Sequence, residues 1–430
     1  MSGIILGDMA ARGSLDPVSV AEYEKAGGFG ALKKAAKMAG GDIVAEVKKA
    51  KLLGRGGGAH PFGDKLEHIL NIPETPKYIA CNASEDEPGT FKDRFLLDRL
   101  PLKLVEGIAI AGFALKAKAG YVYARGGYRK IQKQLIKAVE NARSAGFLGK
   151  NILGTGFDFD IHVSSGAGAY VCGEDTALLN SIEGKVGRPR IKLPPDLEEG
   201  GLFLKPVLVN DVESFVKIPA IVGMGGDEFL KIGHPDSGGT KLVCLSGHVR
   251  KRGVFEVPLG KLSLREIIYD GGLGGGIAGG KNLKFIHLGG QSGPIGGPGL
   301  LDTVYSYTDI KKAGLGVGSG AVVVMDETVS IIDYLKCVVE FFANESCGKC
   351  VPCREGTRHI LDILDKLSIP GAAGSGDLGT LRRLVRTMTD ASFCGLGTTA
   401  VTALNSAWEH FKAEFEAKVR GGEKNEPLQA

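Results

Sequence analysis

Apolar residues in the first half of this chain gather in short consecutive runs, and longer stretches with helical spacing lie between the runs. A short run predicts a buried strand, and the helical spacing predicts an amphipathic helix. The predicted strands cover residues 77–82, 120–125, 158–164 and 206–210, and the predicted helices cover 18–38 with a break at Gly27-Gly28, 42–50, 91–117, 130–145 and a segment ending at 182. Strands that alternate with helices are typical of an α/β fold. We therefore expect an α/β domain over residues 1–235.

The second half of the chain shows two other patterns. Residues 242–249, 253–258, 283–288 and 321–325 predict strands, with a short helix at 262–269. This set resembles a small β-grasp module, for which we expect the boundaries 236–327. Amphipathic helices are then predicted at 331–343, 356–367, 378–388 and 404–415. Four such helices can form a four-helix bundle, so we expect a third domain over 328–430.

Composition and charge exclude several classes of protein. The chain has 430 residues, 43% of them hydrophobic and 24% charged, as in an ordinary globular protein with room for about three domains. No apolar run approaches the roughly 18 residues that a membrane span needs, and the N-terminus lacks the pattern of a signal peptide. We therefore expect a cytoplasmic protein without direct membrane insertion. A net charge of +4, with no basic run between aromatics, argues against a nucleic-acid partner.

The cysteines point to a metal centre. Cys347, Cys350 and Cys353 form two consecutive C-x₂-C steps, and Cys394 follows about forty residues later. Three thiolates on one turn and a distant fourth are typical of a [4Fe-4S] cluster. A zinc site usually uses two separated pairs of ligands, and free thiols are the remaining alternative. The other four cysteines are isolated and form no disulfide framework: Cys81, Cys172, Cys244 and Cys337.

Glycine is about twice as frequent as in an average protein, with 66 residues. Many of these residues stand in short runs at the ends of predicted strands, where the backbone can approach a phosphate or a ring closely. The loop from Gly54 to Gly58 precedes Lys65, and a second loop at 165–173 precedes Glu174 and Asp175. Taken alone, the glycine loop at 54–58 is as compatible with a flexible loop as with a phosphate-binding loop. The acidic loop at 83–90 and the strand-to-helix junction at 206–214 also follow predicted strands. Because ligands of α/β folds bind beyond strand ends, these segments together favour a nucleotide-shaped ligand.

Several of these segments also resemble one known family. The resemblance rests on residues 54–65, 81–94, 166–180, 183–185, 345–358 and 394–397, in the expected order. These strings are similar to the NADH-oxidising flavoprotein subunit of respiratory complex I, a module that also occurs in NAD-linked hydrogenases and formate dehydrogenases. The resemblance implies a Rossmann-like FMN-binding domain, a β-grasp domain of the SLBB type and a four-helix bundle that holds one [4Fe-4S] cluster.

The resemblance also implies a set of site residues. The flavin would be lined by Gly54, Gly56, Lys65, Asn82, Glu85, Tyr170, Gly173, Glu174 and Asn210, and the same loops add Gly57, Asp211 and Ser214 to the cofactor-binding set. The nicotinamide nucleotide would face Glu87, Asp175 and Lys192. The cluster ligands would be Cys347, Cys350, Cys353 and Cys394. No acid–base residue of the chain is expected, because hydride would pass from NAD(H) to FMN and electrons would then pass singly to the cluster.

The family resemblance further implies partner subunits. These would be a thioredoxin-like [2Fe-2S] subunit and a larger iron–sulfur or catalytic subunit of the same complex, which could lie at the periphery of a membrane.

This chain departs from the family pattern where the nucleotide would stack. The usual Gly-Phe-Pro-Thr is Ala59-His60-Pro61-Phe62 here, and the usual Lys-Pro-Pro-Phe-Pro is replaced from Lys192 to Asp196. His60 or Phe62 could take over the stacking. One alternative is a flavin and iron–sulfur electron relay that binds no nicotinamide nucleotide, and another is a purely structural subunit. A third alternative is NADP(H), because a short Asp175 near Arg188 and Arg190 could leave room for a 2′-phosphate.

Overall fold

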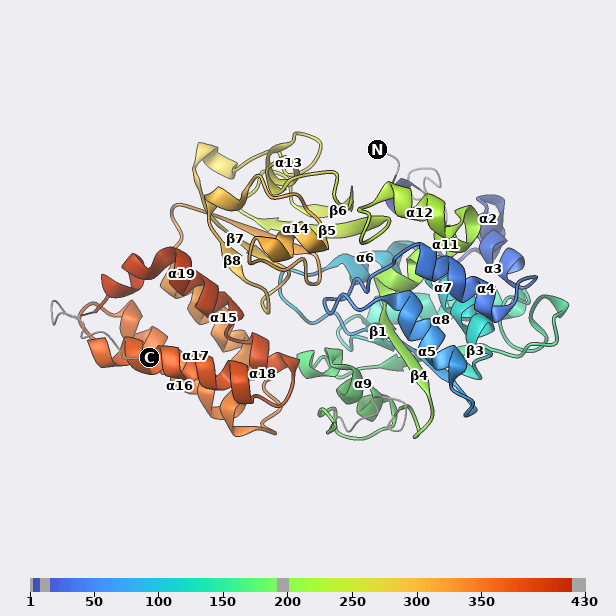
Figure 1. Ribbon diagram of the computed structural model, residues 1–430. Coiled ribbons are helices and arrows are strands. Elements are labelled where there is room, and N and C mark those ends of the chain that lie inside the picture. Colours follow the sequence, from blue (N-terminus) through green and yellow to red (C-terminus); the bar gives the residue numbers. More distant parts are fainter. Residues whose placement is uncertain (1–2, 8–15, 192–200, 420–430) are drawn as a thin grey trace.

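The computed structural model describes residues 3–7, 16–191 and 201–419. Its first sheet contains four strands, β1 (Tyr78–Ala83), β2 (Ala119–Ala124), β3 (Asp160–Ser165) and β4 (Val207–Asp211). All neighbouring strands are parallel and lie in the order β3-β2-β1-β4 (Figure 1). The four predicted strands are thus confirmed to within a residue or two. This part of the chain has the expected mixed α/β fold.

The two faces of β1 belong to different hydrophobic cores. Ile79 and Cys81 pack into a core with the helices of the first half of the chain. Tyr78 and Ala80 point to the opposite face and pack into a core that also contains apolar residues of the C-terminal helices. This alternation follows from the period of two in a strand. The sheet therefore connects the N-terminal and C-terminal parts of the molecule.

Helices α6 (Lys92–Arg99) and α7 (Pro101–Leu115) occupy the stretch for which the sequence predicts one helix. Pro101 begins α7, where its missing N–H costs no helical hydrogen bond, but it could not continue α6. Nearly every residue of α7 is buried, and the helix passes close to α11 (Val212–Met224). A Cβ atom at Gly107 would lie 2.0 Å from the carbonyl oxygen of Phe215, so this close approach requires glycine.

Two helices of this half were not predicted from the sequence: α5 (Phe62–Asn71), which begins four residues after the glycine loop, and α12 (Gly226–Ile232). The expected break at Gly27 is confirmed, because Gly27 has a positive φ between α2 and α3. The other elements are α2 (Val20–Lys25), α3 (Gly30–Ala35), α4 (Gly40–Lys49), α8 (Arg129–Ser144), α9 (Asp175–Ile182) and the 3₁₀ turns η1 (Ile152–Gly154) and η2 (Tyr170–Gly173).

A second sheet of five strands follows. Its strands are β5 (Thr240–Gly247), β6 (Gly253–Pro258), β7 (Leu283–Leu288), β8 (Ile295–Gly296) and β9 (Ala321–Asp326), in the order β6-β5-β9-β7-β8. Only β5 and β9 pair in parallel, and the other pairs are antiparallel. The sheet has its own hydrophobic core, to which α13 (Leu264–Tyr269) and α14 (Tyr307–Lys312) contribute, and short turns η3 (Ala278–Gly280) and η4 (Pro298–Leu300) lie between its strands.

The last part of the described chain is helical (Figure 1). Its long helices are α15 (Ile331–Glu345), α16 (Val351–Ser368), α17 (Ser375–Ala391) and α19 (Thr402–Glu416), with the short α18 (Gly395–Thr399) after Cys394. Helix α16 begins five residues before the predicted start. Cys353 therefore lies in its first turn, and the expectation that all three cysteines stand in a loop between helices was wrong.

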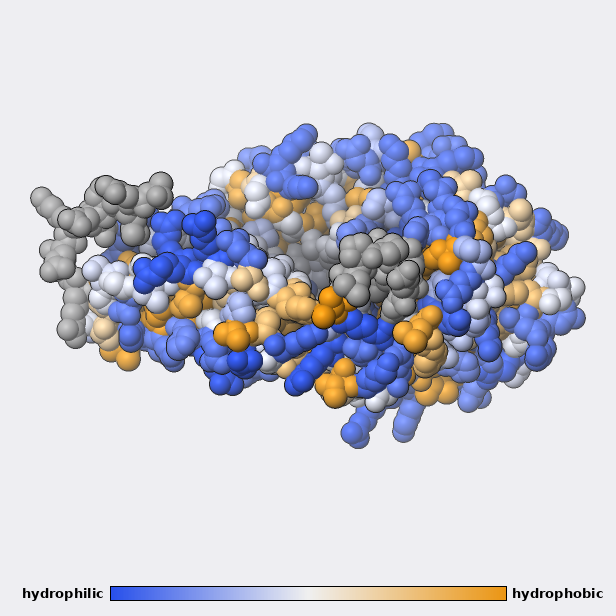
Figure 2. All heavy atoms as spheres, turned by 60° about the horizontal axis from the view of Figure 1, so that its bottom comes forward, coloured by the Kyte–Doolittle hydropathy of each residue, from blue (hydrophilic) through white to orange (hydrophobic). Residues whose placement is uncertain are grey.

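Apolar side chains can be followed along the helices and over one face of the molecule (Figure 2). Among the residues described, no helix combines the length and the apolar composition that crossing a membrane requires. On the face that Figure 2 presents, apolar side chains form small separate patches within a mostly hydrophilic surface.

Candidate functional site

The main cavity lies where the order of the parallel strands reverses. Strands β1 and β4 are neighbours, but the chain leaves β1 towards β2 on one side and reaches β4 only after β3. Ligands of open α/β sheets bind at such a point, beyond the carboxyl ends of the strands. The cavity has a volume of about 520 Å³, and Ser84 after β1 and Asp211 at the end of β4 both line it. This volume suits a nucleotide-sized ligand.

Three parts of the chain build the walls of this cavity. The first sheet contributes the loop at 56–58 and the segment from Asn82 to Asp93. The second sheet contributes loops at 289–294 and 316–319, and the C-terminal helices contribute residues 395–399. Neither of the last two sets was predicted as part of the cavity: the loops of the second sheet carry no recognisable motif, and residues 395–397 were singled out only beside Cys394. Lys92 and Asp93 were also missed, although they stand in one of the strings that carry the family resemblance.

Most of the expected cofactor residues meet in this cavity. Its lining includes Gly56, Gly57, Asn82, Glu85, Glu87, Tyr170, Gly173, Glu174 and Asp211. Gly54, Lys65, Asp175, Asn210 and Ser214 do not line it, and Lys192 lies outside the described residues. Lys65 donates to the carbonyl oxygen of Val209 at 2.6 Å, where the sequence suggested a partner for phosphate.

Two local features show that the cavity suits a bound ligand. A Cβ atom added at Gly173 would meet no other atom within 4 Å, so the backbone there borders open space. Asn210 is buried, and its side-chain nitrogen has no hydrogen-bond partner among the described residues. A buried amide without a partner is costly unless a ligand or water completes its bonding. The wall at Gly173 thus leaves room for a ligand, and Asn210, which does not line the cavity, keeps an unpaired donor next to the lining residue Asp211.

Glu87 and Tyr170 form a polar corner of the cavity. The Glu87 carboxylate accepts hydrogen bonds from the backbone N–H and the hydroxyl of Ser292 and, at 3.3 Å, from the hydroxyl of Tyr170. Burial raises the pKa of Glu87, and these three donors oppose that effect. Ser292 belongs to the second sheet, so this corner joins two parts of the chain at the ligand site.

A second, smaller cavity is lined by all four expected cluster cysteines. Burial raises the pKa of Cys353 to about 11, the hydroxyl of Ser346 opposes this, and the neighbouring cysteines raise the pKa further. The thiols are therefore close enough to influence one another. Among the residues described, no three His, Cys, Asp or Glu side chains are placed to share one metal ion. One zinc ion would bring its sulfurs within about 4 Å of one another, whereas a four-iron cluster takes one thiolate on each of four irons.

The two cavities share part of their lining. Val171, from η2, and Leu396, from α18, line both the main cavity and the cysteine cavity. The backbone N–H of Tyr170 donates to a carboxylate oxygen of Glu345 at 2.8 Å, which holds this turn against the end of α15. Groups bound in the two cavities would therefore be separated by only a thin apolar wall.

The structure corrects one expectation about nucleotide stacking. Phe62 is fully buried and packs edge-on against Phe215, so it cannot stack on a ligand. His60 is exposed beside Gly58 at the edge of the cavity and remains the available ring. The second altered stacking position, at 195, lies outside the described residues.

Replacing Gly173 by leucine tests the cavity. Because a Cβ at this position has free space, Gly173→Leu should leave the fold intact while its side chain enters the ligand site. Overpacking typically costs about 1–3 kcal/mol, so FMN affinity should fall about ten- to a hundredfold. Fluorescence titration of the apoprotein with FMN would measure this. Gly41→Leu, at an exposed and equally open position of α4, is the matched control and should bind FMN normally.

Comparisons with known proteins agree with this arrangement. Residues 47–220 match the family model described as the Nuo51 FMN-binding domain, and residues 333–418 match the NADH-ubiquinone oxidoreductase-F iron-sulfur binding region. The first match contains the glycine loops and the acidic loop, and the second contains all four cluster cysteines.

Whole-chain relatives extend these matches. The second F subunit of NADH-quinone oxidoreductase in Rhizobium meliloti is 42% identical over 92% of this chain and 93% of its own length. The HndC subunit of the NADP-reducing hydrogenase of Solidesulfovibrio fructosivorans is 42% identical over 95% of this chain and 82% of its own length. A solved NAD⁺-reducing [NiFe]-hydrogenase superposes with a TM-score of 0.84 at 31% identity, covering 98% of this chain and 67% of that one. The chain therefore belongs to the family of FMN- and iron–sulfur-binding oxidoreductase subunits that includes the F subunits of NADH-quinone oxidoreductases.

Proposed function

We propose that this chain is the electron-input subunit of a multisubunit oxidoreductase, in which hydride is exchanged between NAD(P)H and FMN and single electrons pass to a [4Fe-4S] cluster and on to a partner subunit. The observation that carries this proposal is the shared wall at Val171 and Leu396 between the flavin-sized cavity and the cysteine cavity. The short separation favours electron transfer between groups bound on its two sides.

The residues around the main cavity would bind and orient the cofactor. Bound there, FMN supplies hydride exchange with a nicotinamide and release of electrons one at a time. The bare amides of Gly56 and Gly57 and the side chain of Asn82 would hold its polar groups. Glu87 and Tyr170 stand where a nicotinamide could approach, and the loops of the second sheet exclude water from this side. The four cysteines would each supply one thiolate to the cluster.

Lys65, Asn210 and Ser214 do not line the cavity, and we propose that they hold the residues that line it in place. Ser214 donates its backbone N–H and its hydroxyl to the carboxylate of Asp211, which lines the cavity. Gly54 lies against the side chain of Asn210. We keep Asp175 and Lys192 as proposed nucleotide contacts on the family resemblance alone.

We also propose the finer domain assignment given by the sequence, with boundaries near 235 and 327. The strand order of the second sheet, with parallel β5 and β9 at its centre, supports an SLBB-type β-grasp domain. The packing of α15, α16, α17 and α19 into a common hydrophobic core supports a four-helix bundle around the cluster. The relatives are named as subunits, which supports partner subunits for this chain. A thioredoxin-like [2Fe-2S] partner and a larger iron–sulfur or catalytic partner are proposed on the family resemblance alone. A cytoplasmic location, peripheral to a membrane complex, fits this role.

The choice of nucleotide rests on few residues. Arg190 is already paired with Glu183 at 2.9 Å and donates to the carbonyl oxygen of Gly201, so its guanidinium is occupied. Arg188 is exposed and is the better candidate for a 2′-phosphate. One relative is named as NADP-reducing and others as NADH-quinone oxidoreductase subunits, so both nucleotides belong in the test.

An anaerobic titration of the FMN-loaded protein tests the function. We expect NADH or NADPH to bleach the visible flavin absorption rapidly, because the cavity retains Glu87 and Tyr170 and His60 remains free at its edge. Flavin that stays oxidised with both nucleotides but bleaches with dithionite would overturn hydride exchange. The chain would then be an electron relay between proteins.

A further inference from the structure

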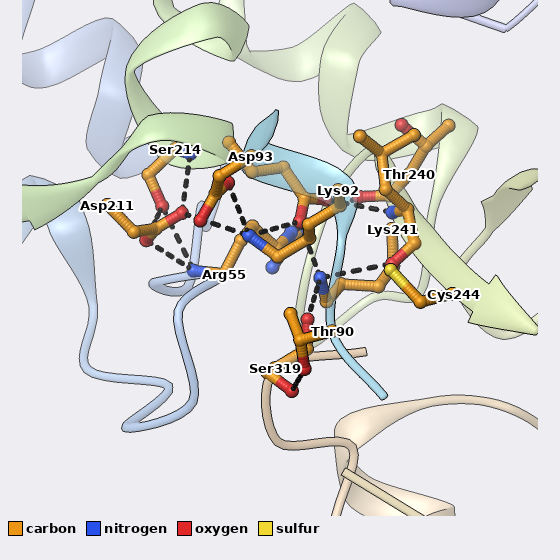
Figure 3. Close-up of polar contacts among 12 residues, drawn as sticks. Arg55, Thr90, Lys92, Asp93, Asp211, Ser214, Thr240, Lys241, Cys244 and Ser319 are labelled. Carbon is orange, nitrogen blue, oxygen red and sulfur yellow. Dashed lines mark hydrogen bonds and ion pairs between the residues drawn. The ribbon is translucent and has the colours of Figure 1, made fainter. Parts of the chain in front are cut away.

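A buried cluster of charged groups forms the floor of the main cavity. Lys92 and Asp93 line this cavity, yet they are only 1% and 7% exposed. Four carboxylates act on the ammonium group of Lys92 and raise its pKa against the opposite effect of burial: Glu85, Asp93, Asp211 and Glu213. Figure 3 shows Lys92, Asp93 and Asp211 converging from α6 and the end of β4, with Lys241 of β5 beside them.

Three of these carboxylates have further donors. Glu213 pairs with Lys241 and accepts from the backbone N–H of Leu242 at 2.9 Å. Asp211 accepts from the backbone N–H of Arg55 and from both the N–H and the hydroxyl of Ser214.

Glu85 is likewise supported by the start of α6. Its two oxygens accept from the backbone N–H groups of Asp93 and Arg94 at 2.7 and 2.8 Å. Burial raises the pKa of Glu85, and Lys92, these two N–H groups and the Tyr128 hydroxyl oppose that effect.

Asp93 is the least supported member of the cluster. Among the described residues, its carboxylate has one hydrogen bond, from Lys92 Nζ at 2.8 Å, and its other oxygen has none. Burial raises its pKa to about 7, Lys92 lowers it, and the charges of Glu85 and Asp211 raise it again. Further charged groups surround this site: Glu213 pairs with Lys92, Lys217 and Lys241, and Arg55 lies beside Asp211. Asp93 therefore combines a place in the cavity lining with fewer hydrogen-bond donors than the other three carboxylates have.

Asp93 lines the cavity in which the flavin is proposed to bind. Negative charge added to the flavin would therefore favour the binding of a proton by the Asp93 carboxylate. We propose that Asp93 is a redox-linked proton site, which takes one proton from water when the flavin in the cavity gains electrons and returns it when the electrons leave. The added electrons reside on the flavin, and the proton forms an O–H bond on the Asp93 carboxyl group without any bond to the ligand. The inference rests on the proposed flavin site but not on the nucleotide, because any reductant can supply the electrons.

Infrared difference spectroscopy on the FMN-loaded full chain tests this inference. Dithionite reduces the flavin, and the reduced-minus-oxidised spectrum should gain the C=O stretching band of a protonated carboxylic acid. The band should be strongest above the pKa of Asp93, because below it the oxidised protein already carries the proton. It should vanish in Asp93→Asn and persist in Asp98→Asn, a control on the same helix whose side chain pairs at the surface with Arg99.

The flavin midpoint potential offers a second readout that a purely structural role would not change. Between neutral and mildly alkaline pH it should fall less steeply with pH in Asp93→Asn than in the wild type or in Asp98→Asn. A wild-type spectrum without the carboxylic acid band overturns the inference by itself, whether or not the Asp93 variant folds. If the band is missing but NADH or NADPH still bleaches the flavin, only the inference about Asp93 fails and the proposed function stands. A chain that binds no FMN overturns both.

Discussion

Replacing Cys350 by alanine should abolish electron transfer out of the flavin site. The structure places Cys350 in the small cavity with the other three cysteines, and its sulfur lies 3.5 Å from the backbone nitrogen of Phe393. A cubane cluster with three of its four protein ligands is exposed to loss of iron. We expect bound iron to fall to background and the electron paramagnetic resonance signal of the reduced cluster to disappear, while flavin reduction continues because Cys350 does not line the main cavity.

A matched cysteine makes this prediction specific. Cys337 lies on α15, is exposed and is not part of the small cavity. Cys337→Ala should therefore retain both iron and the cluster signal. Iron that remains in Cys350→Ala, or iron that is lost equally from Cys337→Ala, would contradict the assignment of the cluster ligands. Flavin content of both variants should match the wild type, which separates cluster loss from unfolding.

Replacing Glu213 by glutamine should destabilise the fold strongly. Glu213 is fully buried on α11, and three lysines compete for its carboxylate: Lys92, Lys217 and Lys241. Breaking a buried ion pair by removing one partner typically costs about 3–5 kcal/mol, because the remaining charges lose their compensation. The loss should appear as a lower midpoint in urea or thermal unfolding at neutral pH.

The pH dependence of this effect has a definite sign. Burial alone would raise the pKa of Glu213, but Lys241, Lys92 and Lys217 outweigh it and lower the pKa to about 2 from an ordinary value of 4.5. A carboxylate with a lowered pKa stabilises the fold fully above its unfolded pKa and loses that contribution as the pH falls through its folded pKa. The stability difference between the wild type and Glu213→Gln should therefore decrease as the pH falls from about 5 towards 2.

An exposed ion pair provides the comparison. Glu228 pairs with Lys231 on α12, and the two side chains are 59% and 69% exposed. Exposed pairs contribute at most about 1 kcal/mol, so Glu228→Gln should change the unfolding midpoint little. Equal effects of the two substitutions would show that the buried cluster does not link α11 to the second sheet.

The cluster cysteines and the strand–helix alternation could be predicted because both depend on spacing along the chain. Cys347, Cys350 and Cys353 are close together in sequence, and their spacing matches a cluster-binding turn before any folding is considered. Apolar runs placed the strands of the first sheet and all those of the second sheet except the two-residue β8, which was not predicted. The start of α16 was misplaced, because Pro352 and Cys353 interrupt the apolar pattern although proline is favourable in a first helical turn.

The details of the cavity could not be predicted, because they depend on contacts between distant segments. The bond from Lys65 to the carbonyl oxygen of Val209 has no signal in the sequence, and Phe62 matches a stacking ring but is buried against Phe215. The packing of helices on the sheet decides which side chains border an open space. Apolar periodicity predicts only which face of an element is buried, and it does not predict which distant segment covers that face.

The sequence by itself determined the α/β class of this protein and predicted four cluster ligands and most of the loops that line the main cavity, because each is encoded within a short segment. Only the tertiary structure decided that Val171 and Leu396 separate two cavities and that loops of the second sheet close the first one. It also decided that Asp93 shares one lysine with three other carboxylates. These groups come from segments that are far apart in the chain, and only burial in a common low-dielectric interior couples their charges.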